Sequence, residues 1–330
     1  MLQRVVYGAV AIIVIVTIVM ADVLVANTHP ENTLLGSLFL RGSLIPLAFT
    51  ILALAGAREL HVLLRIRGHR PHAVLAYATI GLLMLSPWFS AAGFLGDRSD
   101  QIEGMRWQLV WLGVGVISTA LLQVLRRQPR EALRDVGATW LMILYLGFLP
   151  SFANQIRCGR DIPGDDGAWA ILIIILIVKF SDIGGYLVGF TVGRHKLIPG
   201  LSAGKSVEGT LGGIAASVGL AVGLVAVAHT MEAVAGPAAS SDGGEIPKLI
   251  LDMTGMLGRL GYIGAAVFAA ILATVALLGD LFESSLKRDA NRKDSAAVIP
   301  GYGGILDLTD SPWTALPVAW FLLTEVWGVL

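Results

Sequence analysis

Long apolar runs recur along the whole chain, and they constrain its fold more than any other feature. A transmembrane helix needs about 20 mostly apolar residues. Nine stretches meet this criterion, at about 5–26, 44–64, 74–95, 107–125, 136–153, 168–192, 209–229, 262–282 and 312–330. Apolar residues make up 55% of the 330 and charged residues 15%, so a soluble core could not hide these runs. Because the runs are continuous and do not alternate, they exclude a β-barrel. We predict an all-α integral membrane protein, a polytopic bundle of about nine transmembrane helices.

The basic residues between these runs predict how the chain crosses the membrane. If the N-terminus is cytoplasmic, the cytoplasmic segments hold 15 of the 24 Lys and Arg residues and the opposite segments hold seven. Cytoplasmic loops carry an excess of Lys and Arg, so we predict a cytoplasmic N-terminus and an external C-terminus. The first run is longer than the apolar core of a signal peptide, and we expect it to remain as a helix.

No loop is long enough to fold as a separate domain. The longest, about 230–261, is rich in Gly and small residues, and we predict a flexible linker on the outer side. We divide the chain into N-terminal transmembrane helices over 1–160, with about five spans, and a catalytic region over 161–330, with about four. Equal numbers of acidic and basic residues, 24 of each, predict no nucleic-acid partner. The single cysteine, Cys158, excludes a disulfide framework and a Cys-rich zinc site.

Ionisable residues within apolar spans are costly and often functional. In the first half, Arg58 and Glu59 near the end of the second run are interpreted as a local pair or as snorkelling side chains. In the sixth run, Lys179 and Asp182 lie three residues apart, which suits either an internal ion pair or a site. The same run contains glycines spaced by four, from 185 to 193. This ridge permits close packing, either within the chain or in a homodimer.

The loop over 193–206 ends in Gly204-Lys205-Ser206, which resembles the end of a P-loop. A P-loop also needs glycine five residues before Gly204, where this chain has Pro199, so we reject that interpretation. The loop still combines flexible backbone, hydroxyls and cations at the start of the seventh run, where helix N–H groups favour anions. Polyphosphate binding and an ordinary positive-inside loop both remain open.

The densest polar cluster lies between 279 and 311. Asp280, Ser284 and Lys287 share one helix face because their spacing is i, i+4, i+7. Asp307 and Asp310 follow, three residues apart, before the last run. The three aspartates could converge as oxygen ligands for Mg²⁺, which proteins hold through one or two carboxylates together with substrate phosphates. Neighbouring Lys and Arg side chains would neutralise phosphate oxygens during transfer.

These motifs, taken together, are similar to the sequence motifs of a known family. Residues 284–294 and 300–310 read SSLKRDANRKD and PGYGGILDLTD, and together they resemble the signature of phosphatidate cytidylyltransferases (CDP-diacylglycerol synthases). Residues 181–186 (SDIGGY) and 202–209 (SAGKSVEG) resemble two further blocks of the family in the same order. Two positions depart from its pattern: Tyr302 replaces a usual histidine, and Leu308 replaces a usual arginine. Both aspartates of the final block, Asp280 and Lys287 are retained, so we interpret the chain as an active member.

The resemblance implies an activity, in which a phosphatidate oxygen attacks the α-phosphorus of CTP and yields CDP-diacylglycerol and pyrophosphate. It implies CTP, phosphatidic acid and bilayer lipid as partners and Mg²⁺ as cofactor, and it leaves open whether a second, monovalent cation assists. Asp280, Asp307 and Asp310 would hold the metal. Ser284 and Lys287 would contact the transferring or leaving phosphates. The remaining predicted contacts are Ser202, Lys205 and Ser206 with the nucleotide, Arg288 and Lys293 with the lipid phosphate, and Asp182 elsewhere in the site.

Two other functions remain open from the sequence. Another CTP-dependent membrane enzyme, an isoprenoid-lipid cytidylyltransferase or a polyprenol or phytol kinase, would need similar residues. A transporter could use midplane charges such as Lys179 and Asp182, but its polar residues should fall in both halves of the chain. CDP-alcohol phosphatidyltransferases are disfavoured because their Asp-Gly-x-x-Ala-Arg motif is absent. We expect the protein in a bacterial inner membrane, with its catalytic face toward the cytoplasm.

Overall fold

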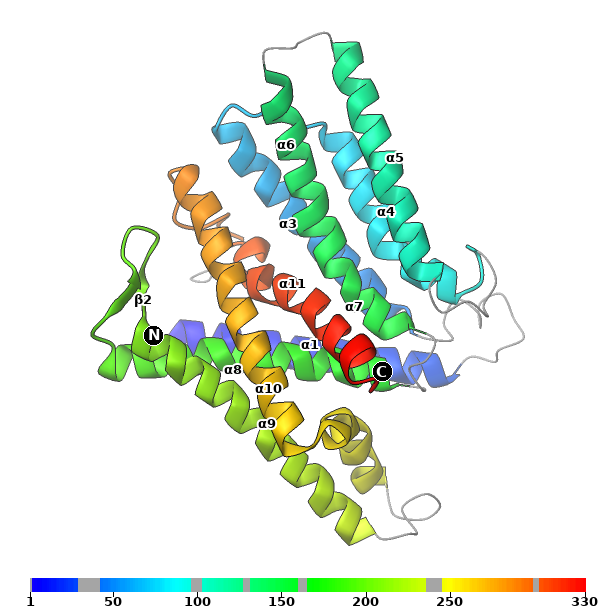
Figure 1. Ribbon diagram of the computed structural model, residues 1–330, viewed down its shortest axis with the longest axis vertical. Coiled ribbons are helices and arrows are strands. Elements are labelled where there is room, and N and C mark those ends of the chain that lie inside the picture. The colour runs from blue at the N-terminus through cyan, green and yellow to red at the C-terminus, as the bar shows by residue number, and fades with distance from the viewer. Residues whose placement is uncertain are drawn as a thin grey trace.

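The computed structural model describes residues 2–28, 42–95, 103–126, 131–159, 165–235, 245–298 and 303–330. These residues form long helices and one short β-hairpin (Figure 1). The first group of helices is α1 (Leu2–Thr28), α3 (Leu44–Ile66), α4 (Ala73–Ala91), α5 (Glu103–Arg126), α6 (Ala132–Ile143), the π-helical η2 (Leu144–Phe148) and α7 (Leu149–Cys158). The second group is α8 (Asp166–Val192), β1 (Lys196–Ile198), β2 (Ser202–Ser206), α9 (Val207–Ala235), α10 (Glu245–Asp289), α11 (Ile305–Phe321) and η4 (Leu322–Val326).

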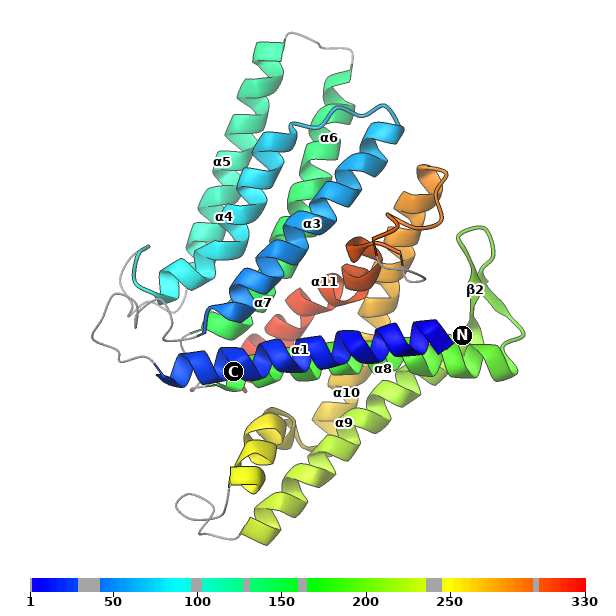
Figure 2. The same cartoon turned by 180° about the vertical axis from the view of Figure 1, so that it is seen from behind.

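Helices α3 to α7 pack together as one bundle at one end of the molecule (Figures 1 and 2). Pro87 lies inside α4 and cannot donate a hydrogen bond to the carbonyl of Leu83. The Ser86 hydroxyl donates to that carbonyl instead, at 3.1 Å. Lipid offers no water to satisfy a freed backbone group, so a side chain must do so. The hydrogen bond from Ser86 therefore allows α4 to contain a proline inside an apolar helix.

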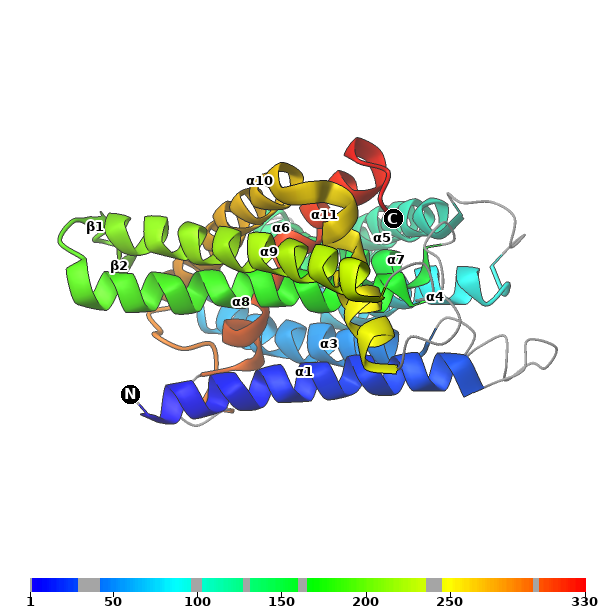
Figure 3. The ribbon, with the colours of Figure 1, turned by 90° about the horizontal axis from the view of Figure 1, so that it is seen from below.

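The glycine ridge of α8 packs against small residues of α9, and the two helices lie side by side when seen from below (Figure 3). A Cβ added at Gly184 would collide with the Cβ of Ala216, and one at Gly209 would lie 2.7 Å from the carbonyl oxygen of Gly185. Close backbone approach is the usual purpose of small residues in membrane helices. The ridge therefore serves packing within this chain.

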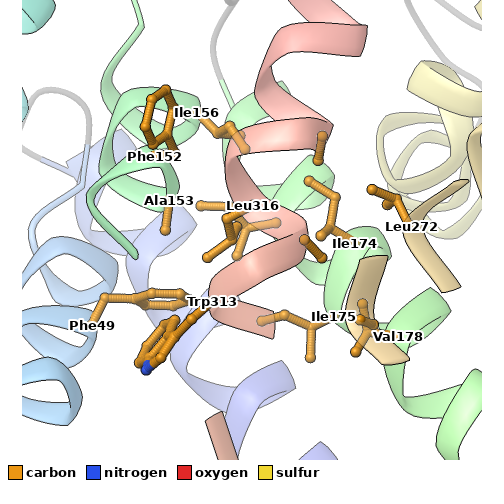
Figure 4. Close-up of a cluster of buried hydrophobic side chains, with 14 of the residues drawn as sticks. Phe49, Phe152, Ala153, Ile156, Ile174, Ile175, Val178, Leu272, Trp313 and Leu316 are labelled. Atoms are coloured by element: carbon orange, nitrogen blue, oxygen red, sulfur yellow. The ribbon is translucent and has the colours of Figure 1, made fainter. Parts of the chain in front are cut away.

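Helix α11 packs against both groups of helices. Figure 4 shows Trp313 and Leu316 of α11 between Phe49 of α3 and the aliphatic side chains of α8. The rings of Phe49 and Trp313 are 5.6 Å apart, a contact worth about 0.5–1.5 kcal/mol beyond its buried area. Because α11 begins at the acidic motif around 307–310, this packing fixes that motif relative to α3.

The N-terminal helix α1 lies along α8 (Figure 2) and is tied to the rest of the chain by a buried ion pair. Arg157 Nε of α7 lies 2.6 Å from Asp22 Oδ2, and both side chains are almost fully buried. The other Asp22 oxygen accepts the N–H groups of Leu44 and Ile45 at 2.7 and 3.0 Å. Asp22 thus caps the start of α3 from a different helix.

The structure confirms an all-α integral membrane protein. Seven helical segments among the described residues are long and apolar enough to cross a membrane. The remaining predicted spans correspond to α1 and to α11 with η4. The count of nine, the orientation and the division at residue 160 stay predictions.

The prediction of a linker over 230–261 was wrong for most of its residues. Helix α9 continues to Ala235, and α10 begins at Glu245 and turns sharply at Gly261. The φ of Gly261 is 67°, which glycine adopts without steric cost. The chain turns at this residue, so the helical residues 245–260 lie before the predicted span at 262–282 and are not part of it. Residues 236–244 lie outside the described part of the chain.

Candidate active site

Three carboxylates from α10 and α11 converge where the two helices meet. One oxygen from each of Asp280, Glu283 and Asp310 can be chosen so that all lie within 4.8 Å of one another. Glu283 is fully buried and Asp310 is 4% exposed, whereas the Asp280 side chain is 30% exposed. Ser311 donates its N–H and its hydroxyl to Asp310 Oδ1, at 2.6 and 3.2 Å, which fixes that carboxylate.

This arrangement suits a divalent cation. Buried carboxylates are unfavourable unless they are paired or coordinate a metal, and three in one place repel one another. Among the described residues, the oxygens of Glu283 have no hydrogen-bond donor besides the Lys287 ammonium. Oxygen ligands are the kind that hard cations such as Mg²⁺ and Ca²⁺ take, so the donor set fits a cation of that class.

Two lysines border the carboxylates. Lys205 of β2 places its Nζ 2.5 Å from Asp280 Oδ2. Lys287 lies between two acids, because it forms an ion pair with Glu283 and donates to Asp307 Oδ1 at 2.5 Å. Beside a bound cation, these two ammonium groups would add positive charge for phosphate oxygens.

Asp307 lies outside the three-carboxylate group, and its two oxygens accept hydrogen bonds from other residues of the chain. Its Oδ2 accepts the Gly304 N–H at 2.7 Å, the Ser295 N–H at 3.0 Å and the Ser295 hydroxyl at 2.7 Å. Hydrogen bonds from Lys287, Gly304 and Ser295 offset the cost of burying this carboxylate. In this geometry Asp307 caps α11 and orients Lys287, and its predicted role as a metal ligand stays a prediction.

The hairpin that carries Lys205 projects beside the ends of α8 and α9 (Figure 1). The sequence predicts a loop here, whereas β1 and β2 pair as antiparallel strands. Ser206 is buried and its hydroxyl accepts the Gly209 N–H at 3.1 Å, so it caps α9. Ser202 is half-buried. Glu208 accepts the His195 N–H and contacts its Nδ1 at 2.5 Å, which holds the hairpin against α9.

The remaining predicted site residues lie on α8, on α10 and in the segment after α10. Ser284 donates to Asp280 at 3.4 Å, and Lys179 pairs with Asp182 at 3.6 Å, which confirms the internal ion pair. Lys179 also donates to the carbonyl of Leu308 at 3.1 Å. Arg288 is exposed in the last turn of α10, and Lys293 is exposed in the segment after it. Tyr302, one of the two departures from the family pattern, lies outside the described residues.

Three residues at or near the centre are missing from the set predicted from the sequence. Glu283 is three residues after Asp280 and four before Lys287, so helical spacing could have identified it. Tyr145 of η2 packs its ring against Phe282, with centroids 5.2 Å apart. Its buried hydroxyl has no hydrogen-bond partner among the described residues, and π-helical segments such as η2 are frequent at functional sites. Glu59 of α3 is the third: it binds Ser295 and the start of α11 and is not limited to a local pair with Arg58.

Known proteins with similar sequences belong to the family that these motifs resemble. The chain is 30% identical over 278 residues to the phosphatidate cytidylyltransferase of Bacillus subtilis (strain 168), covering 84% of this chain and 89% of that protein. It is 28% identical to the phosphatidate cytidylyltransferase of Synechocystis sp., covering 89% of this chain and 92% of the relative. The protein of the same name from Mycobacterium leprae is 32% identical over 192 residues, but the match spans only about half of its length, 51%. Residues 2–326 match the cytidylyltransferase family, and the chain therefore belongs to that family.

Proposed function

We propose that this protein transfers CMP from CTP to phosphatidic acid and so forms CDP-diacylglycerol and pyrophosphate. The observation that carries the proposal is the cluster of Asp280, Glu283 and Asp310 with Lys205 and Lys287 at the ends of membrane helices. The similarity to phosphatidate cytidylyltransferases over most of the chain supports the choice of substrates.

In the reaction, a phosphate oxygen of phosphatidate attacks the α-phosphorus of CTP. The new P–O bond forms as the bond from the α-phosphorus to the bridging oxygen breaks, and pyrophosphate leaves with that electron pair. Since the lipid phosphate is itself the nucleophile, no covalent protein intermediate is needed. Positioning and charge neutralisation supply most of the acceleration in such transfers.

Asp280, Glu283 and Asp310 would hold a Mg²⁺ ion, with Asp307 as the further predicted ligand. Bound Mg²⁺ would neutralise phosphate oxygens and orient the nucleotide. Lys205 and Lys287 would neutralise the leaving phosphates, assisted by Ser284. We assign Ser202 and Ser206 to the nucleotide side of the site, Arg288 and Lys293 to the lipid phosphate, and Asp182 to the edge of the site.

We further propose nine spans in a bacterial inner membrane, with the catalytic face toward the cytoplasm, where CTP is available. The positive-inside count supports this orientation. Phosphatidate would then arrive laterally within the bilayer and meet CTP at the helix ends.

Label transfer from CTP tests this function against the kinase alternative. The detergent-purified protein is incubated with Mg²⁺, phosphatidate and CTP labelled either on the α- or on the γ-phosphate. We expect label in the lipid product from α-labelled CTP only, and the γ-label in pyrophosphate. Lipid labelled from the γ-position would indicate a kinase, and transfer to an isoprenyl phosphate in preference to phosphatidate would change the acceptor class.

A further inference from the structure

Glu59 of α3 is a buried acid whose hydrogen bonds reach far along the chain. Its Oε2 lies 2.8 Å from the Ser295 hydroxyl and accepts the Leu306 N–H at 2.9 Å, and its Oε1 accepts the Ile305 N–H at 2.9 Å. The side chain is 7% exposed. Ile305 and Leu306 begin α11 and Ser295 precedes it, so Glu59 joins the N-terminal helices to the acidic motif of the active site.

The start of α11 needs an acceptor from another part of the chain. The first N–H groups of a helix have no partner within the helix, and the N-cap residue Gly304 has no side chain to offer. Asp307 accepts the Gly304 N–H, and Glu59 accepts the next two. A carboxylate is also favoured at this end by the helix dipole. Glu59 therefore supplies the cap that the sequence of α11 lacks.

The same contacts lead to the catalytic groups. The Ser295 hydroxyl lies within hydrogen-bond distance of both Glu59 and Asp307, at 2.8 and 2.7 Å. Asp307 in turn accepts from Lys287 at 2.5 Å. Asp310, a member of the carboxylate cluster, follows Asp307 by about one helical turn. A displacement of the first turn of α11 would therefore move Asp310 and Lys287 together.

We infer that Glu59 is a positioning residue of the active site, through which the N-terminal helices set the place of α11 and hence of Asp310 and the Asp307–Lys287 pair. This inference rests on the function proposed above. Two backbone N–H groups and a hydroxyl face the Glu59 carboxylate. In Glu59→Gln, the new amide NH₂ group would face at least one of these donors and could not accept its hydrogen bond. The isosteric change keeps the packing volume and removes the charge.

The chain contains a matched control for this variant. Asp22 of α1 is also buried and also accepts two backbone N–H groups at the start of another helix, α3. It lies at the opposite end of α3 from Glu59, roughly 20 Å away at 1.5 Å per residue. Asp22→Asn therefore removes a charged cap at a distance from the site, and because it also breaks the buried ion pair with Arg157 it is the more severe of the two changes.

The experiment compares Glu59→Gln with Asp22→Asn in the full-length, detergent-purified protein. Hydrogen exchange of residues 303–311 reports the order of the first turn of α11 without any need for turnover. Pyrophosphate release gives kcat and the Mg²⁺ concentration for half-maximal rate. We expect Glu59→Gln to accelerate exchange at 303–311, to lower kcat about 10- to 100-fold and to raise the Mg²⁺ requirement. Asp22→Asn should accelerate exchange at 44–47 and keep both kinetic values within twofold.

Ser295→Ala is a second variant with a smaller effect on folding, and it should change exchange and kcat in the same direction as Glu59→Gln. If Glu59→Gln does not fold, Ser295→Ala against Asp22→Asn decides the question. Unchanged exchange at 303–311, or kinetics equal to those of Asp22→Asn, would overturn the inference. An inactive wild-type protein would contradict the proposed function instead, and the exchange data would still decide whether Glu59 orders α11.

Discussion

Lys205 Nζ in the hairpin lies 2.5 Å from Asp280 Oδ2 in α10. The two residues are far apart in the sequence, and the pair joins the hairpin to the carboxylate cluster. The Lys205 side chain is 23% exposed and the Asp280 side chain 30%, so solvent and a ligand can reach both. Such a lysine can exchange its carboxylate partner for a phosphate when a nucleotide binds.

Replacement of Lys205 by alanine should therefore weaken nucleotide use. We expect the KM for CTP to rise at least about tenfold, which corresponds to about 1.4 kcal/mol. Lys196 of β1 is exposed in the same hairpin, and Lys196→Ala is the control, with an expected change below twofold. Steady-state kinetics at saturating phosphatidate measure both. Equal effects of the two variants would show that the hairpin acts only through its overall charge.

Asp310→Asn and Asp307→Asn should change thermal stability in opposite directions. Without a cation, Asp310 adds a buried like charge to Asp280 and Glu283, so Asp310→Asn should raise the melting temperature in EDTA while activity falls at least about 100-fold. Asp307 accepts four hydrogen bonds, one of them from Lys287. Its replacement by Asn should cost about 1.5–3 kcal/mol and also abolish turnover. Melting curves in detergent provide the comparison, and shifts of the same sign would contradict the distinction between ligand and cap.

The packing of α8 on α9 predicts a difference between two glycine variants. Gly184→Ala should lower the melting temperature because the added Cβ collides with Ala216. A Cβ added at Gly219 of α9 would meet no atom within 4 Å among the described residues, and Gly219→Ala should be neutral or slightly stabilising. Thermal unfolding in one detergent tests both. A tolerated Gly184→Ala would mean that the two helices can separate without loss of stability.

The proposed orientation can be tested by labelling with a membrane-impermeant maleimide. The protein has one native cysteine, Cys158, which is buried, so a Cys158→Ala background removes it. Gly200→Cys lies in the hairpin turn and Glu232→Cys near the far end of α9, and both positions are exposed. In right-side-out bacterial vesicles we expect labelling at 232 only, and in inverted vesicles at 200 only. The reverse pattern would place the active site outside.

The helices could be predicted from sequence because a spanning segment must satisfy all its backbone groups within one helix. The run expected at 168–192 is α8, from Asp166 to Val192. The order of the polar motifs was sufficient to recognise the family. The sharp turn at Gly261 could not be predicted, since a glycine in a helical sequence only permits a positive φ and does not require it.

The grouping of the acidic residues also depended on the fold. Asp280, Asp307 and Asp310 looked equivalent in the sequence, but the side chains around Ser295 and Gly304 determine which of them joins Glu283. The contact of Glu59 with Ile305 spans 246 positions, and no local pattern indicates it. Sequence motifs can thus identify the chemistry, while capping contacts between distant helices decide the role of each carboxylate.

Pyrophosphate release tests the central claim most directly. The detergent-purified protein is supplied with CTP and phosphatidate together or singly, with Mg²⁺ or with EDTA. We predict release that requires both substrates and disappears with EDTA. Release from CTP without phosphatidate, persistence of the activity in EDTA, or no release from folded protein would contradict the account.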